Sequence, residues 1–124
     1  MYLLDTHVLL WALYDSSKLT DVAKKAISQS ACVVSVASLW EISIKHSLGK
    51  LDLAQSVTEI AAKCSEYGIR LLGIRPEHCQ FMESLPFIHR DPFDRMLIAQ
   101  AHEENLILIT KDEFAVQYSS HTLW

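Results

Sequence analysis

Short apolar runs alternate with helix-like patterns along this chain, and this alternation restricts the possible folds more than any other feature. Five runs are candidate strands: Tyr2 to Leu4, Cys32 to Ser35, Arg70 to Ile74, Leu106 to Ile109 and a short one near His121 to Trp124. Strands that alternate with helices usually pair in parallel, so the pattern predicts an α/β domain with a parallel sheet. Because the runs are continuously apolar, we expect the strands to be covered on both faces.

The segments between these runs carry helix signals. Helices are expected after a Thr20 cap, over Val36 to Leu48, after a Ser56–Glu59 capping box, from Pro76 toward Pro86, and from Asp91-Pro92 to about Glu104. The helix after Thr20 is expected to bury a stripe of Val22, Ala23, Ala26 and Ile27. Gly49 and Gly68 are expected to end the second and third of these helices.

The composition indicates one soluble globular domain covering residues 1–124. Half of the residues are apolar and 21% are charged. No apolar run approaches the roughly 18 residues of a membrane span, and no basic leader precedes a long apolar segment, so we expect neither membrane insertion nor secretion. The three cysteines, Cys32, Cys64 and Cys79, are widely spaced among apolar neighbours. We expect them to be buried thiols in the reducing cytoplasm.

The net charge of −4 is unusual for a nucleic-acid-binding domain, which normally has a basic surface. Divalent cations bound among clustered carboxylates would cancel the charge of a site that faces phosphate. The rest of the surface would then be close to neutral, so tight non-specific binding through many phosphate contacts is not expected.

Four acidic residues stand where strands or helices would present them to one crevice: Asp5, Glu41, Asp94 and Asp112. Asp5 and Asp112 follow apolar strand runs, and ligands of open parallel sheets gather outside the carboxyl ends of the strands. Glu41 interrupts an apolar helical stretch, and Asp94 lies near the start of another. Carboxylates beside apolar segments are costly to bury without a cation or hydrogen bonds. Hard oxygen ligands of this kind suit Mg²⁺ or Mn²⁺ better than Zn²⁺.

Asp5 and Glu41 also have ordinary structural interpretations. Asp5 could cap a helix that begins near Thr6, and a carboxylate has enough lone pairs to cap a helix and bind a metal together. Glu41 could pair with Lys45 four residues later, which is worth only a few tenths of a kcal/mol. Glu41 nevertheless lies at the edge of the apolar stripe of its helix, so the two interpretations stay balanced.

The alternatives for the other two acids are stronger. In Asp91-Pro92-Phe93-Asp94, Asp91 suits the N-cap, and Asp94 suits the first helical turn, where an acid interacts well with the helix dipole. Spacing alone does not choose between Asp91 and Asp94 as a metal ligand. Asp112 taken alone is better explained as a turn or cap residue. The prediction of a site therefore depends on the four acids as a set.

Other chemistries fit the sequence less well. There is no Cys-x-x-Cys or His-x-x-x-His pair for zinc, and His78 and Cys79 are expected to be packing residues. A glycine-rich phosphate loop and a Gly-x-Ser-x-Gly nucleophile elbow are also absent. A phosphoacceptor signalling domain would need a second acid beside Asp5, where this chain has Leu4 and Thr6.

Four motifs follow one another along the chain: Leu4-Asp5-Thr6, Ser38-Leu39-Trp40-Glu41-Ile42, Asp91-Pro92-Phe93-Asp94-Arg95-Met96-Leu97-Ile98-Ala99-Gln100-Ala101 and Thr110-Lys111-Asp112. Over essentially the full length they resemble PIN-domain proteins, specifically the VapC-like toxin ribonucleases of type II toxin–antitoxin pairs. The resemblance implies a three-layer α/β/α sandwich with a short central parallel sheet and an active site at its carboxyl edge. It also implies that Asp5, Glu41, Asp94 and Asp112 form the acidic quartet, with Asp91 as a capping neighbour.

The activity implied by the resemblance is metal-assisted hydrolysis of RNA phosphodiester bonds with Mg²⁺, or Mn²⁺, as the cofactor. Asp5 and Asp94 are expected to bind metal directly. Glu41 and Asp112 are expected to bind it directly or through water, or to orient the attacking water. Thr110 could hydrogen-bond a carboxylate or water, but a plain strand-end threonine is the favoured interpretation. Arg95 and Lys111 lie beside acids and could meet substrate phosphate, but they are expected to be solvated surface charges.

The resemblance further implies an RNA substrate, a cognate antitoxin protein that covers the same region, and a homodimer. The alternative function is a catalytically silent PIN-fold module that only docks a partner protein. Leu10, Trp11 and Trp40 would then supply an apolar docking surface.

Overall fold

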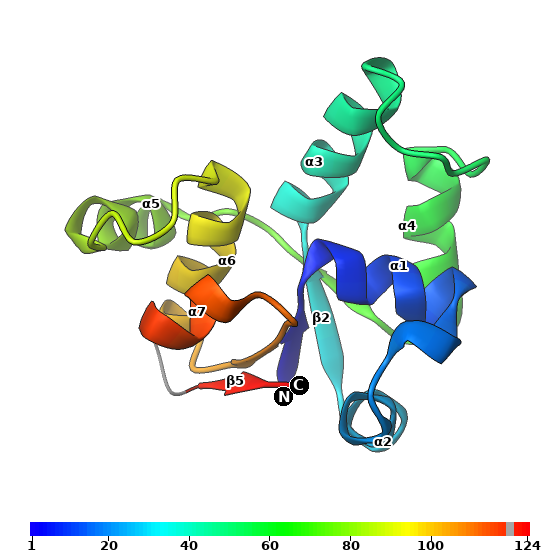
Figure 1. The fold of residues 1–124 in the computed structure, drawn as a ribbon, viewed down its shortest axis with the longest axis horizontal. Helices are drawn as coiled ribbons and strands as arrows, with labels where there is room; N and C mark the ends of the chain where they lie inside the picture. Colours follow the sequence, from blue (N-terminus) through cyan, green and yellow to red (C-terminus); the bar gives the residue numbers. More distant parts are fainter. Residues whose placement is uncertain (119–120) are drawn as a thin grey trace.

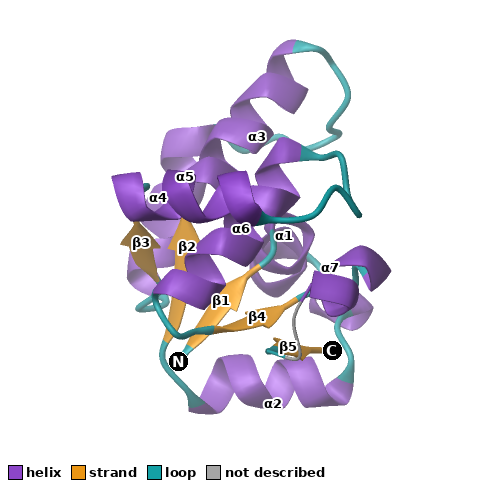
Figure 2. Ribbon diagram, turned by 90° about the vertical axis from the view of Figure 1, so that its left-hand side faces the viewer, coloured by secondary structure: helices purple, strands orange, loops and turns teal. Residues whose placement is uncertain are grey.

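Parallel strands and helices alternate along the chain, as the sequence predicts. The computed structural model describes residues 1–118 and 121–124. Their elements are, in order, β1 (Tyr2–Leu4), α1 (Thr6–Tyr14), the 3₁₀ turn η1 (Ser16–Lys18), α2 (Asp21–Gln29), β2 (Cys32–Ser35), α3 (Val36–Ser47), α4 (Val57–Glu66), β3 (Arg70–Leu72), α5 (Pro76–Ser84), α6 (Pro92–Glu103), β4 (Ile107–Ile109), α7 (Glu113–Tyr118) and β5 (Thr122–Leu123). The strands form one parallel sheet in the order β3-β2-β1-β4-β5 (Figure 2).

The sheet separates two apolar cores. Leu4 pairs in register with Val34 and Ile109, and these side chains pack into the core formed with α1, α2 and α4. Their neighbours one residue earlier face the opposite core, which contains α6 and parts of α5 and α7. Figure 1 shows α1, α2 and α4 on one side of the sheet and α5, α6 and α7 on the other. The three-layer α/β/α sandwich is confirmed.

The two halves of the sheet diverge between β1 and β4. From β1 the chain moves outward to β2 and β3, and it then returns beyond β1 to form β4 and β5. The carboxyl ends of β1 and β4 are hydrogen-bonded neighbours, since the Asp5 N–H donates to the Ile109 carbonyl at 3.0 Å. Such a switch point leaves a crevice where the loops after two adjacent strands separate in opposite directions.

The helix boundaries follow the predicted signals closely. The Thr20 hydroxyl accepts from the Ala23 N–H at 3.1 Å, and Ser56 and Glu59 form the capping box. Gly49 and Gly68 take φ values of +65° and +71° just beyond α3 and α4, the left-handed conformation that ends helices and that glycine adopts without steric cost.

Three predictions about burial were wrong. Val22 is 52% exposed, whereas the other members of its predicted stripe pack on the core, with Ala23 buried and Ala26 and Ile27 half-buried. Cys79 is also exposed, on α5, whereas Cys32 and Cys64 are buried as expected. Strand β3 lies at the edge of the sheet, so Arg70 and Leu71 are exposed instead of covered on both faces. No helix in the described part of the chain combines the length and the apolar character needed to cross a membrane.

Candidate active site

A cavity of about 500 Å³ opens at the switch point, and all four predicted acids line it. They arrive from four separate elements: Asp5 from the end of β1, Glu41 from α3, Asp94 from α6, and Asp112 from the segment after β4. The cavity wall also includes Asp91 and two lysines, Lys45 and Lys111, with His7 and Trp11 from α1. The structure therefore brings together four carboxylates that are up to 107 positions apart in the chain.

Asp5 caps a helix and belongs to the acid cluster at once. Its Oδ1 accepts from the His7 N–H at 3.4 Å, which caps α1, and its Oδ2 accepts from the Thr110 hydroxyl at 2.5 Å. The carboxylate is buried, and this desolvation raises its pKa, although the bond from Thr110 acts in the opposite direction. Thr110 therefore hydrogen-bonds a carboxylate, which was the less favoured of its two interpretations from the sequence.

Both oxygens of Glu41 are held by donors from this chain. The Thr6 hydroxyl donates to Oε1 at 2.7 Å, and the Lys45 ammonium donates to Oε2 at 2.8 Å. Burial lowers the pKa of Lys45, but the hydrogen bond and charge of Glu41 outweigh it and raise the pKa. The ordinary ion pair with Lys45 is therefore present, yet Glu41 is buried beside the other acids and not on a solvated helix face.

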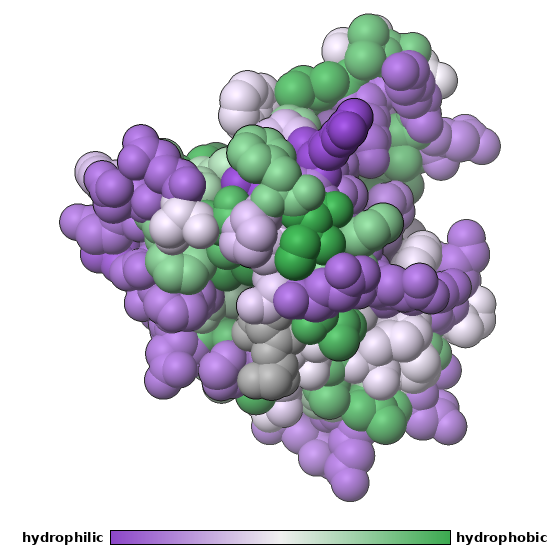
Figure 3. Space-filling model, turned by 60° about the vertical axis from the view of Figure 1, so that its left-hand side comes forward, coloured by the Kyte–Doolittle hydropathy of each residue, from purple (hydrophilic) through white to green (hydrophobic). Residues whose placement is uncertain are grey.

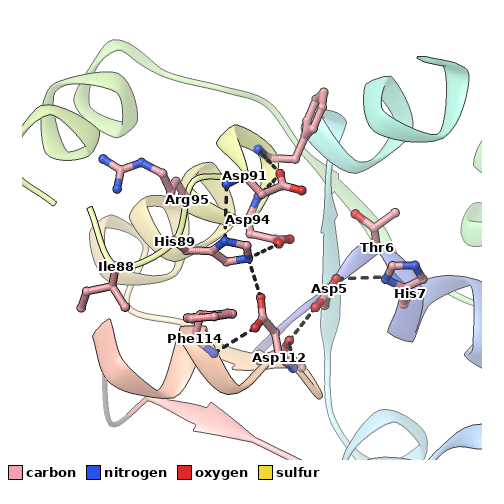
Figure 4. A network of polar contacts seen from close by, with 12 residues as sticks. Asp5, Thr6, His7, Ile88, His89, Asp91, Asp94, Arg95, Asp112 and Phe114 are labelled. Atoms are coloured by element: carbon pink, nitrogen blue, oxygen red, sulfur yellow. Dashed lines mark hydrogen bonds and ion pairs between the residues drawn. The ribbon is translucent and has the colours of Figure 1, made fainter. Parts of the chain in front are cut away.

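Asp91 and Asp94 take different roles, although spacing could not separate them. The Oδ1 atom of Asp91 accepts from the N–H groups of Phe93 and Asp94, at 2.8 and 3.2 Å, and so caps α6. The side chain of Asp94 points toward the other acids (Figure 4). Desolvation and the nearby charges of Asp5, Asp91, Asp112 and Glu41 raise the pKa of Asp94 to about 7.

His89 joins Asp94 to Asp112. Its Nε2 atom lies 2.8 Å from Asp94 Oδ2 and 3.0 Å from Asp112 Oδ2. Asp112 also caps α7, as its Oδ1 accepts from the Phe114 N–H at 2.9 Å, and its own N–H donates to Thr110 Oγ1 at 3.0 Å. Each of the four acids is thus oriented by at least one donor from this chain.

Sequence reasoning missed several residues of this site. His89 lies in the loop before α6 and belongs to no spacing pattern. The one available signal was its closeness in sequence to Asp94, which follows five residues later. Thr6 follows Asp5 directly, but nothing local indicates that its hydroxyl reaches Glu41, 35 residues away. Lys45 was considered only as an ordinary surface partner.

Two neighbouring residues, Arg95 and His78, differ from their expected roles, and a third, Lys111, agrees with its expected role. Arg95 is not solvated: it is 5% exposed and donates to the Pro86, Met82 and Leu85 carbonyls. Lys111 is exposed as expected and lines the cavity. His78 is buried but is more than a packing residue, because its Nε2 lies 2.8 Å from Glu104 Oε2.

The donor set of the cavity fits a hard divalent cation. The four carboxylates supply the oxygen ligands that Mg²⁺ and Mn²⁺ prefer, and their mutual repulsion is the kind that a cation relieves. One ligand atom each from His89, Asp94 and Asp112 also lie within 4.8 Å of one another. Asp94 and Asp112 are therefore close enough to bind one cation together.

Comparison with known proteins agrees with this architecture. The PIN-domain family model matches residues 2–118. Ribonuclease VapC22 of Mycobacterium tuberculosis is 30% identical over 112 residues, which cover 89% of this chain and 85% of the relative.

Two solved structures share the fold. A chain of a toxin–antitoxin complex from Klebsiella pneumoniae superposes with a TM-score of 0.66 at 16% identity, covering 100% of this chain and 97% of the other. A chain of VapBC2 from Rickettsia felis, bound to a DNA fragment from the promoter of the pair, superposes with a TM-score of 0.63 at 15% identity, covering 98% and 95%.

An acid-lined crevice at the switch point of a parallel α/β/α sandwich defines the class of protein, which is a PIN-fold domain. The chain belongs to the PIN-domain family, and it is VapC-like.

Proposed function

We propose that this protein is a divalent-metal-dependent endoribonuclease that hydrolyses RNA phosphodiester bonds as the toxin of a toxin–antitoxin pair, with residues 1–124 acting as one domain. The observation that carries the proposal is the convergence of Asp5, Glu41, Asp94 and Asp112 on one cavity, where the pKa of Asp94 is raised to about 7. Acids with strongly raised pKa values are frequent in functional sites. Four carboxylates gathered around one cavity without a cation would be an unfavourable arrangement to retain.

The four carboxylates would hold Mg²⁺, or Mn²⁺, with Asp5 and Asp94 as the direct ligands. When bound, such a cation lowers the pKa of a coordinated water and stabilises the charge that develops on phosphate. Glu41 and Asp112 would hold a cation directly or through water, or orient the attacking water. Thr6 and Thr110 fix the carboxylate oxygens of Glu41 and Asp5, which limits the reorganisation needed during reaction.

The substrate must bring negative charge to a cavity that is itself acidic. Lys45 and Lys111 line the same cavity, so they are the residues of this chain that would face the phosphates of RNA. Few cations surround the cavity, which favours a substrate recognised by shape and exposed bases more than by many phosphate contacts.

The partners we propose are an antitoxin protein and a second copy of this chain. The supporting observations are the VapC likeness and large apolar side chains left on the surface. Trp40 is 60% exposed and packs edge-on against Phe93, with ring centroids 5.3 Å apart, beside an almost wholly apolar groove of about 210 Å³. Figure 3 shows such apolar surface between polar regions on one face. Contiguous apolar surface of this kind usually marks a protein interface.

The alternative is a silent PIN module that only docks a partner. The three residues expected to form its docking surface are not equally exposed in the structure. Leu10 and Trp11 are half-buried, and Trp11 packs against Trp124 with centroids 5.8 Å apart, so Trp40 is the more available residue.

One experiment separates the two functions. Purified protein is incubated with structured RNA in Mg²⁺ or in EDTA, together with Asp94→Asn and with Asp52→Asn, which removes an exposed acid outside the cavity. Ribonuclease function predicts cleavage in Mg²⁺ that is lost in EDTA and in Asp94→Asn but kept in Asp52→Asn. Cleavage that persists in EDTA or in Asp94→Asn would contradict the metal mechanism, and no cleavage by the wild type would favour the docking module.

A further inference from the structure

The loop between α5 and α6 is fixed by a buried arginine. Arg95 is 5% exposed and has no carboxylate partner among the residues that the structure describes. Its guanidinium donates to the Pro86 carbonyl at 2.9 Å, to Met82 at 3.2 Å and to Leu85 at 3.3 Å. A buried charge is costly, and here it is compensated by carbonyl groups of this one segment.

Tyr118 holds the same loop from α7. Its hydroxyl accepts from the N–H groups of Ile88 and His89, at 2.9 and 2.7 Å, and donates to the Pro86 carbonyl at 2.6 Å. The backbone of His89 is therefore positioned from two helices, α6 through Arg95 and α7 through Tyr118. The loop contains no helix or strand, so these hydrogen bonds are what fix its backbone.

The side chain of His89 is oriented as well as its backbone. Its Nδ1 accepts from the Asp91 N–H at 3.4 Å, and its ring packs against Phe114 with centroids 4.9 Å apart. Because Nδ1 is an acceptor, the proton of the neutral ring lies on Nε2. Nε2 contacts both Asp94 Oδ2 and Asp112 Oδ2, as the dashed lines in Figure 4 show.

We propose that His89 is a positioning residue of the active site, which holds the carboxylates of Asp94 and Asp112 together so that both can bind one cation. Its Nε2 lies 2.8 Å from Asp94 Oδ2 and 3.0 Å from Asp112 Oδ2, and the ligand atoms of this cluster lie within 4.8 Å of one another. Both carboxylates thus converge on one point before a cation arrives.

A hydrogen bond from His89 leaves lone pairs of both carboxylates available. Each carboxylate oxygen has two lone pairs, so the oxygens can accept from His89 and still bind a metal. Direct coordination by Nε2 would instead require the proton to move to Nδ1, which would lose the bond from the Asp91 N–H. His89 therefore hydrogen-bonds to the carboxylates that bind the metal and does not coordinate the metal itself.

The inference rests on the proposed function and is tested with Mn²⁺ alone as the probe. The affinity for Mn²⁺ is measured by the loss of the free-ion signal in electron paramagnetic resonance, in wild type, His89→Ala, His89→Gln and His102→Ala. Glutamine places an amide N–H near the position of Nε2, and His102 is a largely exposed histidine on α6 away from the cavity. Thermal unfolding in EDTA checks that each variant is folded.

Removing hydrogen-bond partners of metal ligands typically weakens binding about 10- to 100-fold. We expect a loss of about 10-fold or more in His89→Ala, recovery to within about threefold of wild type in His89→Gln, and no change in His102→Ala. A merely structural role of the loop would not be restored by glutamine, so the rescue separates positioning from stability.

Two results would overturn the inference while leaving the proposed function intact. One is wild-type Mn²⁺ affinity in His89→Ala. The other is a nitrogen hyperfine coupling in the pulsed spectrum of the wild-type Mn²⁺ complex that disappears in His89→Ala, because it would make His89 a direct ligand. Failure of the wild type to bind Mn²⁺ at all would instead remove the metal site and the inference together.

Discussion

Replacing Asp94 by asparagine should stabilise the metal-free protein at neutral pH while it abolishes cleavage. In the folded protein the pKa of Asp94 is raised from 3.8 to about 7 by desolvation and by the neighbouring acids. The ionised form is therefore disfavoured by folding. Asparagine has nearly the same shape and carries no charge, so it removes this unfavourable term from the folded state.

The magnitude follows from the two pKa values. The difference between 3.8 and about 7, at about 1.4 kcal/mol per pH unit, corresponds to about 4 kcal/mol above pH 7. Asparagine accepts a weaker hydrogen bond from His89 than a carboxylate does, which costs about 1 to 2 kcal/mol. A net gain of about 2 to 3 kcal/mol in the free energy of unfolding remains.

The dependence on pH is as specific as the magnitude. Below pH 3.8 Asp94 is protonated in both the folded and the unfolded chain, so its ionisation costs the folded protein no stability. As the pH rises toward about 7, the folded protein holds a proton that the unfolded chain has released, and the free energy of unfolding falls. The advantage of Asp94→Asn should therefore be small near pH 4 and largest at pH 8.

Urea unfolding in EDTA at pH 4, 6 and 8, followed by circular dichroism, measures this advantage in wild type, Asp94→Asn and Asp52→Asn. Asp52→Asn controls for the loss of one negative charge at an exposed position. Equal stabilities of wild type and Asp94→Asn at pH 8 would refute the reasoning, since the four acids would then not repel one another. Saturating Mg²⁺ should remove or reverse the difference, because only the wild type retains the full ligand set.

Three further substitutions test other contacts. Thr110→Val removes the hydroxyl that donates to buried Asp5, so we expect a loss of about 2 kcal/mol in urea unfolding at pH 7 and reduced RNA cleavage; unchanged stability would show that this bond contributes nothing net. Arg95→Met leaves the Leu85 carbonyl without its donor and the Pro86 carbonyl with Tyr118 alone, so we expect a loss of about 3 kcal/mol by urea unfolding and weaker Mn²⁺ binding through His89. Trp40→Glu places a charge on the exposed aromatic pair with Phe93, so if the proposed dimer forms through this pair, light scattering should report a dimer for the wild type and a monomer for the variant; a dimer that survives the substitution would place the interface elsewhere.

Much of the fold could be predicted because its signals are local. A cap and its helix involve residues three or four apart, as at Thr20 and in the Ser56–Glu59 capping box, and both are present in the structure. Continuous apolar runs located all five strands, with differences only in the end residues. The positions of Asp5 and Asp112 after strands were enough to expect them at one edge of the sheet.

The burial of individual side chains was less predictable. Val22 and Cys79 have apolar neighbours in sequence but lie on exposed helix faces. Arg95 follows Asp94 in a helix start that looked solvated, yet it is enclosed by the loop before α6. Local patterns describe the residue and its own helix, whereas burial depends on which elements pack against it.

The amino-acid sequence alone determined the parallel α/β architecture and the helix ends, because these depend on propensity, periodicity and capping within a few residues, whereas the choice of Asp94 over Asp91 came from the resemblance of the motifs to PIN-domain proteins. The tertiary structure alone decided how the acids are held. Thr110 reaches Asp5 across 105 residues only because β1 and β4 pair in parallel, and His89 reaches Asp94 and Asp112 only because two helices fix its loop. Such contacts depend on the relative placement of separate elements, which hydrogen bonding between strands and burial of side chains establish only when the whole chain has folded.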